Sequence, residues 1–182
     1  MSAIGYTVGA ASREHLHMLP DIERSAAEIF PNDVLPPEMR AGTVPLEQLE
    51  AAYIEERLWT VLTKAGIPVG FAIAVRKSNS AFLQEVSVHP AHQQKGLGRQ
   101  LVLRAISWAE KHGYSCVTLT TFEHIPWNAP FYLRLGFRKL AEQELSCELL
   151  SQLQNEYRRG LRHRVAMQFD LAEHSSSTLQ LL

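Results

Sequence analysis

The chain has 182 residues, of which 46% are hydrophobic and 20% charged, as is typical of a globular domain with a substantial core. Its formal net charge of −1 argues against a general nucleic-acid binder, and no apolar run approaches the ~20 residues that cross a membrane. Met1–Arg13 lack the apolar core of a secretory signal, and Cys116 and Cys147 suggest no disulfide framework, so a cytoplasmic location is expected.

The first third of the chain combines one strand signal with helical periodicity. Tyr6–Ala10 is predicted to be a short strand. Apolar residues recur at helical spacing over His15–Phe30, and Leu46–Glu56 predicts a second helix. Four of the nine prolines lie between these helices, so residues 31–45 are expected to form a loop.

Strand signals dominate the middle of the chain. Leu58–Lys64 and Val69–Val75 are apolar runs with β-branched members, and Ala81–Val88 is a third. The polar turn at residues 77–80 makes 69–88 a hairpin.

The rest of the chain alternates helices and strands. The predicted elements are helix Leu97–His112, strand Cys116–Phe122, helix Asn128–Leu135, strand Phe137–Leu140, helix Cys147–Arg159 and strand Arg164–Leu171. This order predicts an α/β (α+β) fold with a mixed sheet of about seven strands. Residues 1–172 are expected to form a single domain, and 173–182 a flexible tail.

The most informative segment joins a predicted strand to a predicted helix. It reads Val86-Ser87-Val88-His89-Pro90-Ala91-His92-Gln93-Gln94-Lys95-Gly96-Leu97-Gly98-Arg99. Backbone N–H groups of such a loop form an anion site with the positive helix end, and Lys95 and Arg99 add positive charge. The P-loop pattern is absent, and a dinucleotide fingerprint would need a third glycine. An ordinary glycine-capped turn remains the alternative.

Two motifs resemble those of the GCN5-related N-acetyltransferase (GNAT) superfamily. Gln93-Gln94-Lys95-Gly96-Leu97-Gly98 resembles its Q/R-x-x-G-x-G/A pyrophosphate loop. The segment Asn128-Ala129-Pro130-Phe131-Tyr132-Leu133-Arg134-Leu135-Gly136-Phe137 is similar to its N-x-x-A/P-x-x-x-Y-x-x-x-G-F region in compact form. The resemblance covers residues 58–140 most strongly. It implies a GNAT fold, a splayed mixed sheet with helices on both faces and acetyl-CoA in the splay.

The resemblance also implies roles for individual residues. Main chain at 86–88 would pair with the pantetheine arm and polarise the thioester carbonyl. Asn128 would bind near the pantetheine, with a helix N-cap as the alternative. Tyr132 is the candidate general acid for the departing thiolate, with core packing as the alternative. The expected cofactor-binding residues are Val86, Ser87, Val88, Gln93, Gln94, Lys95, Gly96, Leu97, Gly98, Arg99, Asn128 and Tyr132.

The proton of the acceptor amine needs a base, since an alkylammonium has a pKa of ~10.4. Glu85, on the strand expected to bind pantetheine, is the candidate catalytic base; a solvated strand glutamate is the alternative. Glu123 and His124 are weaker candidates. Glu23 and Glu28, in the first predicted helix, are candidates for binding a cationic acceptor.

Charge is divided unevenly along the chain, with −6 over residues 1–60 and +5 over 61–182. This division is either scatter or an acidic half for a cationic substrate and a basic half for an anionic cofactor. The prediction is an N-acetyltransferase that transfers acetyl from acetyl-CoA to a small cationic amine by direct attack. A non-catalytic acyl-CoA sensor and a protein N-terminal or lysine acetyltransferase are the alternatives.

Three further expectations concern metals, surface charge and assembly. The histidines show no metal-ligand spacing, so no metal is expected. A homodimer is a possible assembly. A basic run is expected to be a solvated face, with contact to the CoA 3′-phosphate as the alternative; it comprises Arg158, Arg159, Arg162, His163 and Arg164.

Overall fold

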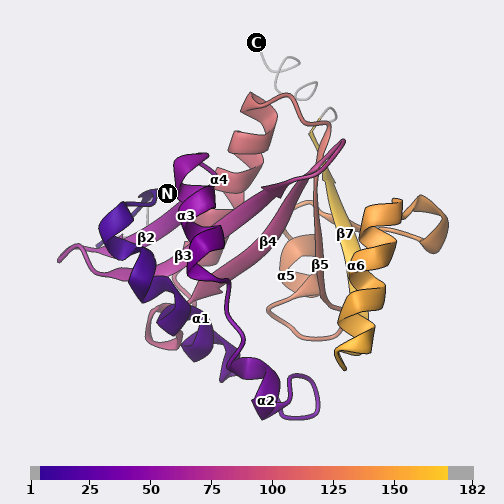
Figure 1. The fold of residues 1–182 in the computed structure, drawn as a ribbon, viewed down its shortest axis with the longest axis horizontal. Coiled ribbons are helices and arrows are strands. Elements are labelled where there is room, and N and C mark those ends of the chain that lie inside the picture. The colour runs from indigo at the N-terminus through magenta and orange to yellow at the C-terminus, as the bar shows by residue number, and fades with distance from the viewer. Residues whose placement is uncertain (1–4, 172–182) are drawn as a thin grey trace. The chain divides into compact units, whose positions relative to one another are not determined.

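The computed structural model (Figure 1) describes residues 5–171, apart from the Glu38 side chain. The chain divides into two compact units. The first unit comprises the chain up to Val75 together with Leu83–Trp108. The second comprises Arg76–Phe82 and the described residues from Ala109 onward. The predicted tail, 173–182, lies outside the described residues.

In the described part of the chain, seven strands form a mixed sheet in the order β1-β2-β3-β4-β5-β7-β6, which confirms the predicted fold class. Antiparallel pairs are β1–β2, β2–β3, β5–β7 and β6–β7, and the β4–β5 pair is parallel. The strands are β1 Tyr6–Ala10, β2 Leu58–Thr63, β3 Pro68–Arg76, β4 Ala81–Val88, β5 Cys116–Phe122, β6 Arg138–Lys139 and β7 Arg164–Asp170. The α-helices are α1 Leu19–Ala27, α2 Pro37–Arg40, α3 Leu46–Ile54, α4 Leu97–Lys111, α5 Ala129–Leu133 and α6 Cys147–Arg158. The 3-10 helices are η1 Arg13–Met18, η2 Pro90–His92 and η3 Glu142–Glu144.

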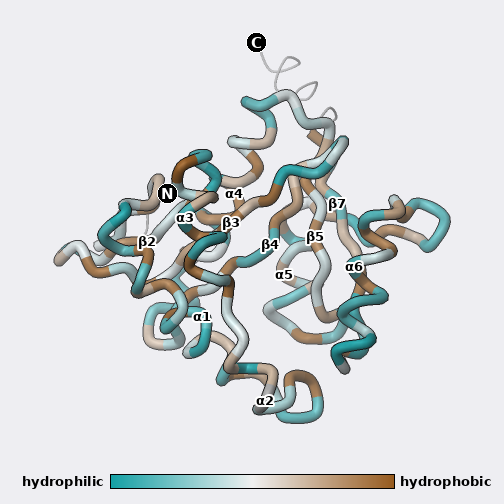
Figure 2. Tube along the Cα trace, in the orientation of Figure 1, coloured by the Kyte–Doolittle hydropathy of each residue, from teal (hydrophilic) through white to brown (hydrophobic). Residues whose placement is uncertain are grey.

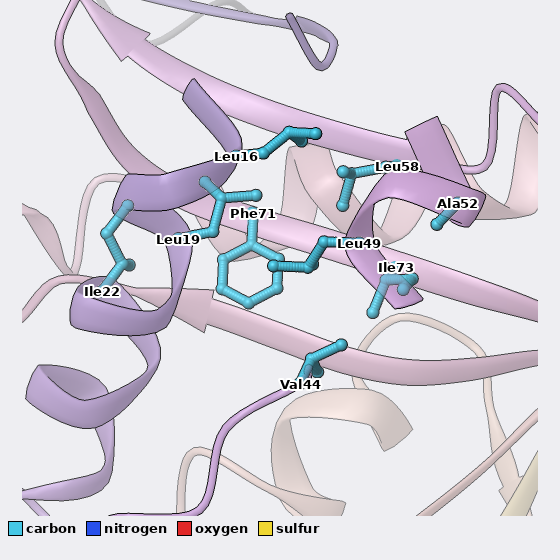
Figure 3. Close-up of a cluster of buried hydrophobic side chains, with 9 residues drawn as sticks. All are labelled: Leu16, Leu19, Ile22, Val44, Leu49, Ala52, Leu58, Phe71 and Ile73. Carbon is cyan, nitrogen blue, oxygen red and sulfur yellow. The ribbon is translucent and has the colours of Figure 1, made fainter. Parts of the chain in front are cut away.

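The core of the first unit lies between helices α1 and α3 and strands β2 and β3 (Figure 3). Leu19 of α1 and Leu49 of α3 lie on either side of Phe71 of β3, and Ile22 and Ile73 belong to the same buried cluster. Full burial of such a side chain contributes about 1.5–3 kcal/mol. This packing fixes α1 and α3 against one face of the strands.

Helix α4 covers the other face of the strands in the first unit. Leu58 of β2 belongs to the core described above, so the next residue, Trp59, faces the opposite side. There its ring meets Trp108 of α4 edge-on, with centroids 6.0 Å apart. Arg104 of α4 also donates to the Val8 carbonyl of β1, at 3.0 Å. These contacts hold the helix that begins at the predicted anion site.

In the second unit, strand β5 presents alternate residues to two different neighbours. Thr120 donates to Glu156 of α6 at 2.6 Å, whereas Thr121 accepts from Asn128, which precedes α5, at 2.8 Å. Strand β5 pairs with β7 over its whole length. Figure 2 shows hydrophilic residues along α6 interrupted by apolar ones, as expected of a helix with one face on the sheet.

The single helix predicted over His15–Phe30 is wrong. A 3-10 helix, η1, is followed there by the α-helix α1. Pro20, in the first turn of α1, has no N–H, and its ring would clash with the carbonyl of Leu16 in a continuous α-helix. The chain therefore changes helix type at this point.

The expectation that residues 31–45 are only a loop also needs correction, because α2 lies within them. Pro37 suits the start of a helix, where a missing N–H removes no hydrogen bond. The guanidinium of Arg40 satisfies two carbonyls of the preceding chain, Leu35 O at 3.0 Å and Phe30 O at 2.6 Å. The other predicted elements are confirmed, with ends that move by at most two residues. No described helix is long and apolar enough to span a membrane.

Candidate active site

The loop at residues 89–96, here called the cofactor loop, connects β4 to the N-terminus of α4. Gln94 and Gly96 have positive φ angles of 60° and 74°, which turn the chain sharply between β4 and α4. The first i−4 bond of α4 joins the Gln100 N–H to Gly96 O, at 3.1 Å. The N–H groups of residues 97–99 precede this bond and have no acceptor within the helix, so they add to its positive end. This geometry suits a phosphate group.

Two side chains of the cofactor loop brace it from within. Gln93 Nε2 donates to the Val88 carbonyl at the end of β4, at 2.9 Å. Lys95 Nζ donates to Ala91 O at 3.2 Å and to the Tyr6 hydroxyl of β1 at 3.0 Å. The Lys95 ammonium is thus engaged within the first unit, while the Arg99 side chain is exposed.

The end of strand β4 packs closely on β3 because β3 carries a glycine there. A Cβ at Gly70 would lie 3.0 Å from Ser87 O and 3.2 Å from Val88 Cγ2. Ser87 and Val88 are buried, and Val86 is half-buried. The His89 N–H donates to Val69 O at 2.9 Å, which fixes the point where β4 passes into the cofactor loop. The sequence analysis did not identify Gly70 as part of this arrangement.

Two predicted acidic residues, Glu23 of α1 and Glu85 of β4, form an interacting pair in the first unit. Burial, and then the negative charge of Glu85, raise the pKa of Glu23 from the usual 4.5 to about 8. The Val44 N–H, which donates to Glu23 Oε2 at 2.8 Å, and the charge of Arg24 oppose this rise. Ser87 Oγ donates to Glu85 Oε1 at 2.7 Å. At neutral pH, Glu23 therefore keeps its proton.

Glu28, the third predicted acidic residue, stands apart from this pair. It follows the last residue of α1 and is exposed. Five positions after Glu23, it lies about 140° around the helix axis at 3.6 residues per turn. The structure brings Glu23 to Glu85 but places Glu28 on another side of the helix.

Asn128, in the second unit, stands at the N-cap position of α5 but does not cap it. Its side chain makes no cap hydrogen bond, and Nδ2 donates instead to Thr121 Oγ1 at 2.8 Å. Its Oδ1 is buried and has no hydrogen-bond partner among the described residues. A buried acceptor in this state is uncommon in proteins, and a ligand N–H group, such as the amides of pantetheine carry, would satisfy it.

Tyr132 lies in α5 and is half-buried. Its ring packs edge-on against Phe131, with centroids 5.0 Å apart, and against Phe137, at 5.4 Å. These contacts fix the ring, so packing and a role in proton transfer are compatible for this residue.

The weaker base candidates lie at the end of β5. Glu123 forms an ion pair with Lys139 at 2.7 Å, and this hydrogen bond and charge lower the pKa of Glu123. A carboxylate stabilised in this way accepts a proton less readily. The His124 ring packs edge-on against His163, with centroids 5.2 Å apart.

The predicted solvated basic run needs correction at Arg164. Its side chain is only 16% exposed, and Nε donates to Glu156 Oε2 at 2.8 Å. Burial favours the neutral acid in Glu156, but Arg164 and hydrogen bonds from Thr120 and Gln152 outweigh it and lower the pKa of Glu156. The spacing of Leu149, Leu153 and Glu156 could have indicated this pair, since it puts an acid on the apolar face of α6. Arg158, Arg159, Arg162 and His163 are exposed, as predicted.

Residues 5–171 contain no group of three or more His, Cys, Asp or Glu side chains that could hold a metal ion.

A family model described as the acetyltransferase (GNAT) family matches residues 19–137.

Several solved structures resemble this chain at low sequence identity. The PaiA N-acetyltransferase of Thermoplasma acidophilum, in complex with coenzyme A, is 16% identical with a TM-score of 0.66, and the match covers 92% of this chain and 99% of that one. The putative acetyltransferase yncA of Salmonella typhimurium, with acetyl-CoA, is 20% identical with a TM-score of 0.65 and coverages of 92% and 94%. N-acetylglutamate synthase of Neisseria gonorrhoeae, with coenzyme A and N-acetyl-glutamate, is 16% identical with a TM-score of 0.68. That match covers 91% of this chain but only 35% of the synthase. At these identities, the likeness establishes the fold.

Proposed function

The chain belongs to the acetyltransferase (GNAT) family, whose reaction uses acetyl-CoA, and on that premise we propose that its acceptor is a small cationic amine that attacks the thioester directly. The observation that carries this proposal is the Glu23–Glu85 pair, which lies in the same unit as the cofactor loop.

Cofactor binding is assigned to three groups of atoms. The N–H groups of residues 97–99 and the positive end of α4 suit the pyrophosphate. Asn128 Oδ1 suits an amide N–H of the pantetheine arm. The main chain of residues 86–88 is assigned to pair with that arm as an added strand would.

Proton transfer is assigned to the carboxyl pair because the pKa of a single carboxylate lies far below that of an alkylammonium. An alkylammonium has a pKa of ~10.4 and an ordinary glutamate one of ~4.3. With Glu85 ionised beside it, Glu23 takes up a proton with a pKa of about 8, much nearer to that of the amine. In this proposal the fully ionised pair receives the ammonium proton, which Glu23 then holds beside the Glu85 carboxylate.

The transfer itself then needs few protein groups. The nitrogen lone pair attacks the carbonyl carbon, the C–N bond forms, the C–S bond breaks, and the electron pair leaves with sulfur. Tyr132 is assigned to protonate or stabilise the departing thiolate, and the main chain near Val86 to polarise the carbonyl. No metal is needed for this sequence.

The choice of a cationic acceptor depends on charge. At neutral pH the pair carries one negative charge, which attracts an ammonium and repels an acidic acceptor. The neighbours in structure do not decide the question, since one is named a ribosomal-protein-S18-alanine N-acetyltransferase and another an N-acetylglutamate synthase.

An assay of CoA release over a panel of amines tests the proposal. The panel should hold polyamines, aminoglycosides, neutral and acidic amino acids, and peptides with free N-termini. We expect the highest kcat/KM for a small cationic amine, and a KM that rises with salt because the attraction is screened. The highest kcat/KM for an acidic amino acid or a neutral N-terminal peptide would refute the acceptor class. Binding of acetyl-CoA without turnover of any amine would favour the sensor alternative.

A further inference from the structure

Four side chains that the proposed reaction does not use gather at the cofactor loop: Tyr6, His89, His92 and Lys95, here called the Tyr6 cluster. The Tyr6 hydroxyl lies 2.8 Å from His92 Nδ1 and accepts from Lys95 Nζ at 3.0 Å. Lys95 also stands over the Tyr6 ring, with Nζ 5.4 Å from its centroid. The His92 ring is edge-on both to Tyr6, at 5.7 Å, and to His89, at 5.9 Å. One residue of β1 thus contacts two residues that lie 86 and 89 positions later in the chain.

The donor inventory of these groups gives the hydrogen bonds a direction. A lysine ammonium has only donors, so Tyr6 oxygen must accept from Lys95. The Tyr6 O–H is then best used toward His92, which requires His92 to be neutral with a lone pair on Nδ1. Burial, and then the positive charges of Lys95 and His89, lower the pKa of His92 below its usual value of 6.5, which keeps the ring neutral at pH 7.

We propose that Tyr6 is a positioning residue for acetyl-CoA binding, which acts through Lys95 and His92 by tethering the cofactor loop to strand β1. The proposal rests on the use of the cofactor loop for acetyl-CoA and goes beyond the residues assigned to the reaction.

The cofactor loop needs such a tether because it holds a non-glycine residue in an unfavourable backbone conformation. Gln94 is a non-glycine residue with a φ of 60°, a conformation that costs about 1–2 kcal/mol. Lys95 lies between Gln94 and Gly96, the two residues with positive φ, and its ammonium reaches both Ala91 O and the Tyr6 hydroxyl. If the loop is free to adopt other conformations, only a fraction of the molecules can bind acetyl-CoA. The apparent affinity for acetyl-CoA is then the intrinsic affinity multiplied by that fraction.

The tether also predicts a dependence on pH. A protonated His92 carries a hydrogen on Nδ1 and can no longer accept from Tyr6. The groups that face His92 among the described residues are Tyr6 of β1, Lys95 of the cofactor loop and His89 at the start of η2. Acetyl-CoA affinity should therefore weaken as the pH falls below the lowered pKa of His92.

The test measures acetyl-CoA dissociation constants by calorimetry for the full chain and its variants. Tyr6→Phe keeps the ring and removes the hydroxyl, and should raise Kd about tenfold at pH 7.5, with kcat at saturating acetyl-CoA nearly unchanged. Its Kd should depend less on pH between 5 and 7.5 than that of the wild type. Tyr157→Phe, at an exposed tyrosine of α6, is the matched control and should leave Kd unchanged.

Lys95→Met decides how Lys95 acts. If Lys95 works through Tyr6, the double variant Tyr6→Phe/Lys95→Met should bind about as weakly as the weaker single variant. Additive losses would mean that Lys95 contacts the phosphates directly and would overturn the tether, as would an unchanged Kd in a folded Tyr6→Phe protein. Should Tyr6→Phe fail to fold, hydrogen exchange of Lys95→Met without cofactor replaces it. The tether predicts faster exchange at residues 89–96, and unchanged exchange there would refute it.

Discussion

Two glutamates with restricted access to water, one in each unit, behave in opposite ways. Glu156 of α6 is 5% exposed and lies beside Arg164, with hydrogen bonds from Thr120 and Gln152. Glu23 of α1 accepts a hydrogen bond from the Val44 N–H, and the charge of another carboxyl group, Glu85, outweighs that of Arg24. The pKa of Glu156 is lowered and that of Glu23 is raised to about 8.

The contrast teaches that partners, and not burial alone, separate a structural acid from a reactive one. Both groups lose favourable hydration when they fold into the protein. For Glu156, an arginine and neutral hydrogen-bond donors replace the lost hydration, and these contacts join β5, α6 and β7. For Glu23 the lost hydration is not replaced to the same extent, so the ionised form is unfavourable. Its carboxyl group therefore gains and loses its proton near pH 8. Such perturbed pairs are typical of functional sites.

The largest effect should follow removal of Glu85, which adds to the effect of burial on Glu23. Glu85→Gln should lower kcat/KM about 10²–10⁴-fold on the best acceptor, because the carboxyl pair assigned to take up the ammonium proton is lost. It should also lower the pKa of Glu23, which NMR titration of the side-chain carboxyl can follow. Glu47→Gln, at an exposed acid in the first turn of α3, is the control. Full activity of Glu85→Gln would leave Glu85 as an ordinary strand residue.

The second test removes the structural acid. Glu156→Ala should destabilise the protein by about 3–5 kcal/mol, because Arg164 is left half-buried without its counter-charge. Urea unfolding gives this free energy, and Gln154→Ala, an exposed neighbour on α6, should change it by less than ~0.5 kcal/mol. Activity per folded molecule should be retained. A loss of kcat in a folded Glu156→Ala protein would remove the distinction between the two acids.

The pH dependence of stability should show the same contrast with opposite signs. The folded pKa of Glu23 lies above the unfolded value of about 4.5, so its contribution is complete below that value and is lost as the pH rises toward about 8. The pKa of Glu156 is depressed, so its contribution is present above the unfolded value and lost as the pH falls.

Glu23→Gln should therefore flatten the decline in melting temperature between pH 5 and pH 9, and Glu156→Gln the decline on the acid side. Wild type and both variants can be compared by thermal unfolding across this range. An unchanged alkaline decline in Glu23→Gln would show that another group is responsible for it.

The smallest effect is expected from a change in backbone conformation at Gly96. Gly96→Ala places a methyl group in open space, but at a φ of 74°. We expect a loss of about 1 kcal/mol in stability and a similar loss in acetyl-CoA affinity, measured by unfolding and calorimetry. Gly9→Ala is the matched control, since its Cβ also meets open space and Gly9 lacks a positive φ. Equal effects of the two substitutions would argue against a special conformation at Gly96.

Much of the fold was predictable from local pattern. Strands such as Cys116–Phe122 follow from short apolar, β-branched runs, and helix α4 from apolar spacing closed by Gly113. The predictions failed where a local signal competed with another. Pro20 divides the first helix although the apolar spacing continues through it, and Arg40 supplies hydrogen bonds that let α2 form in a proline-rich segment.

The turn before α4 and the short helix α5 were also predictable, because backbone conformation there depends on glycine and proline at fixed spacing. Partners were not. The sequence indicated Glu85 as a candidate base and Glu23 and Glu28 as candidates for binding the acceptor. Nothing in their spacing distinguished the residue that meets Glu85, since α1 and β4 are separated by more than fifty residues.

By itself, the sequence determined the order of strands and helices, the position of the cofactor loop and the family of the protein, because these depend on neighbours within a few residues. Only the tertiary structure decided which charges meet. It brought Glu23 within the electrostatic influence of Glu85, paired Arg164 with Glu156 and hydrogen-bonded Lys95 to Tyr6. The physical reason is that pKa values and hydrogen-bond partners depend on burial and on distances between segments remote in the chain, which no local pattern contains.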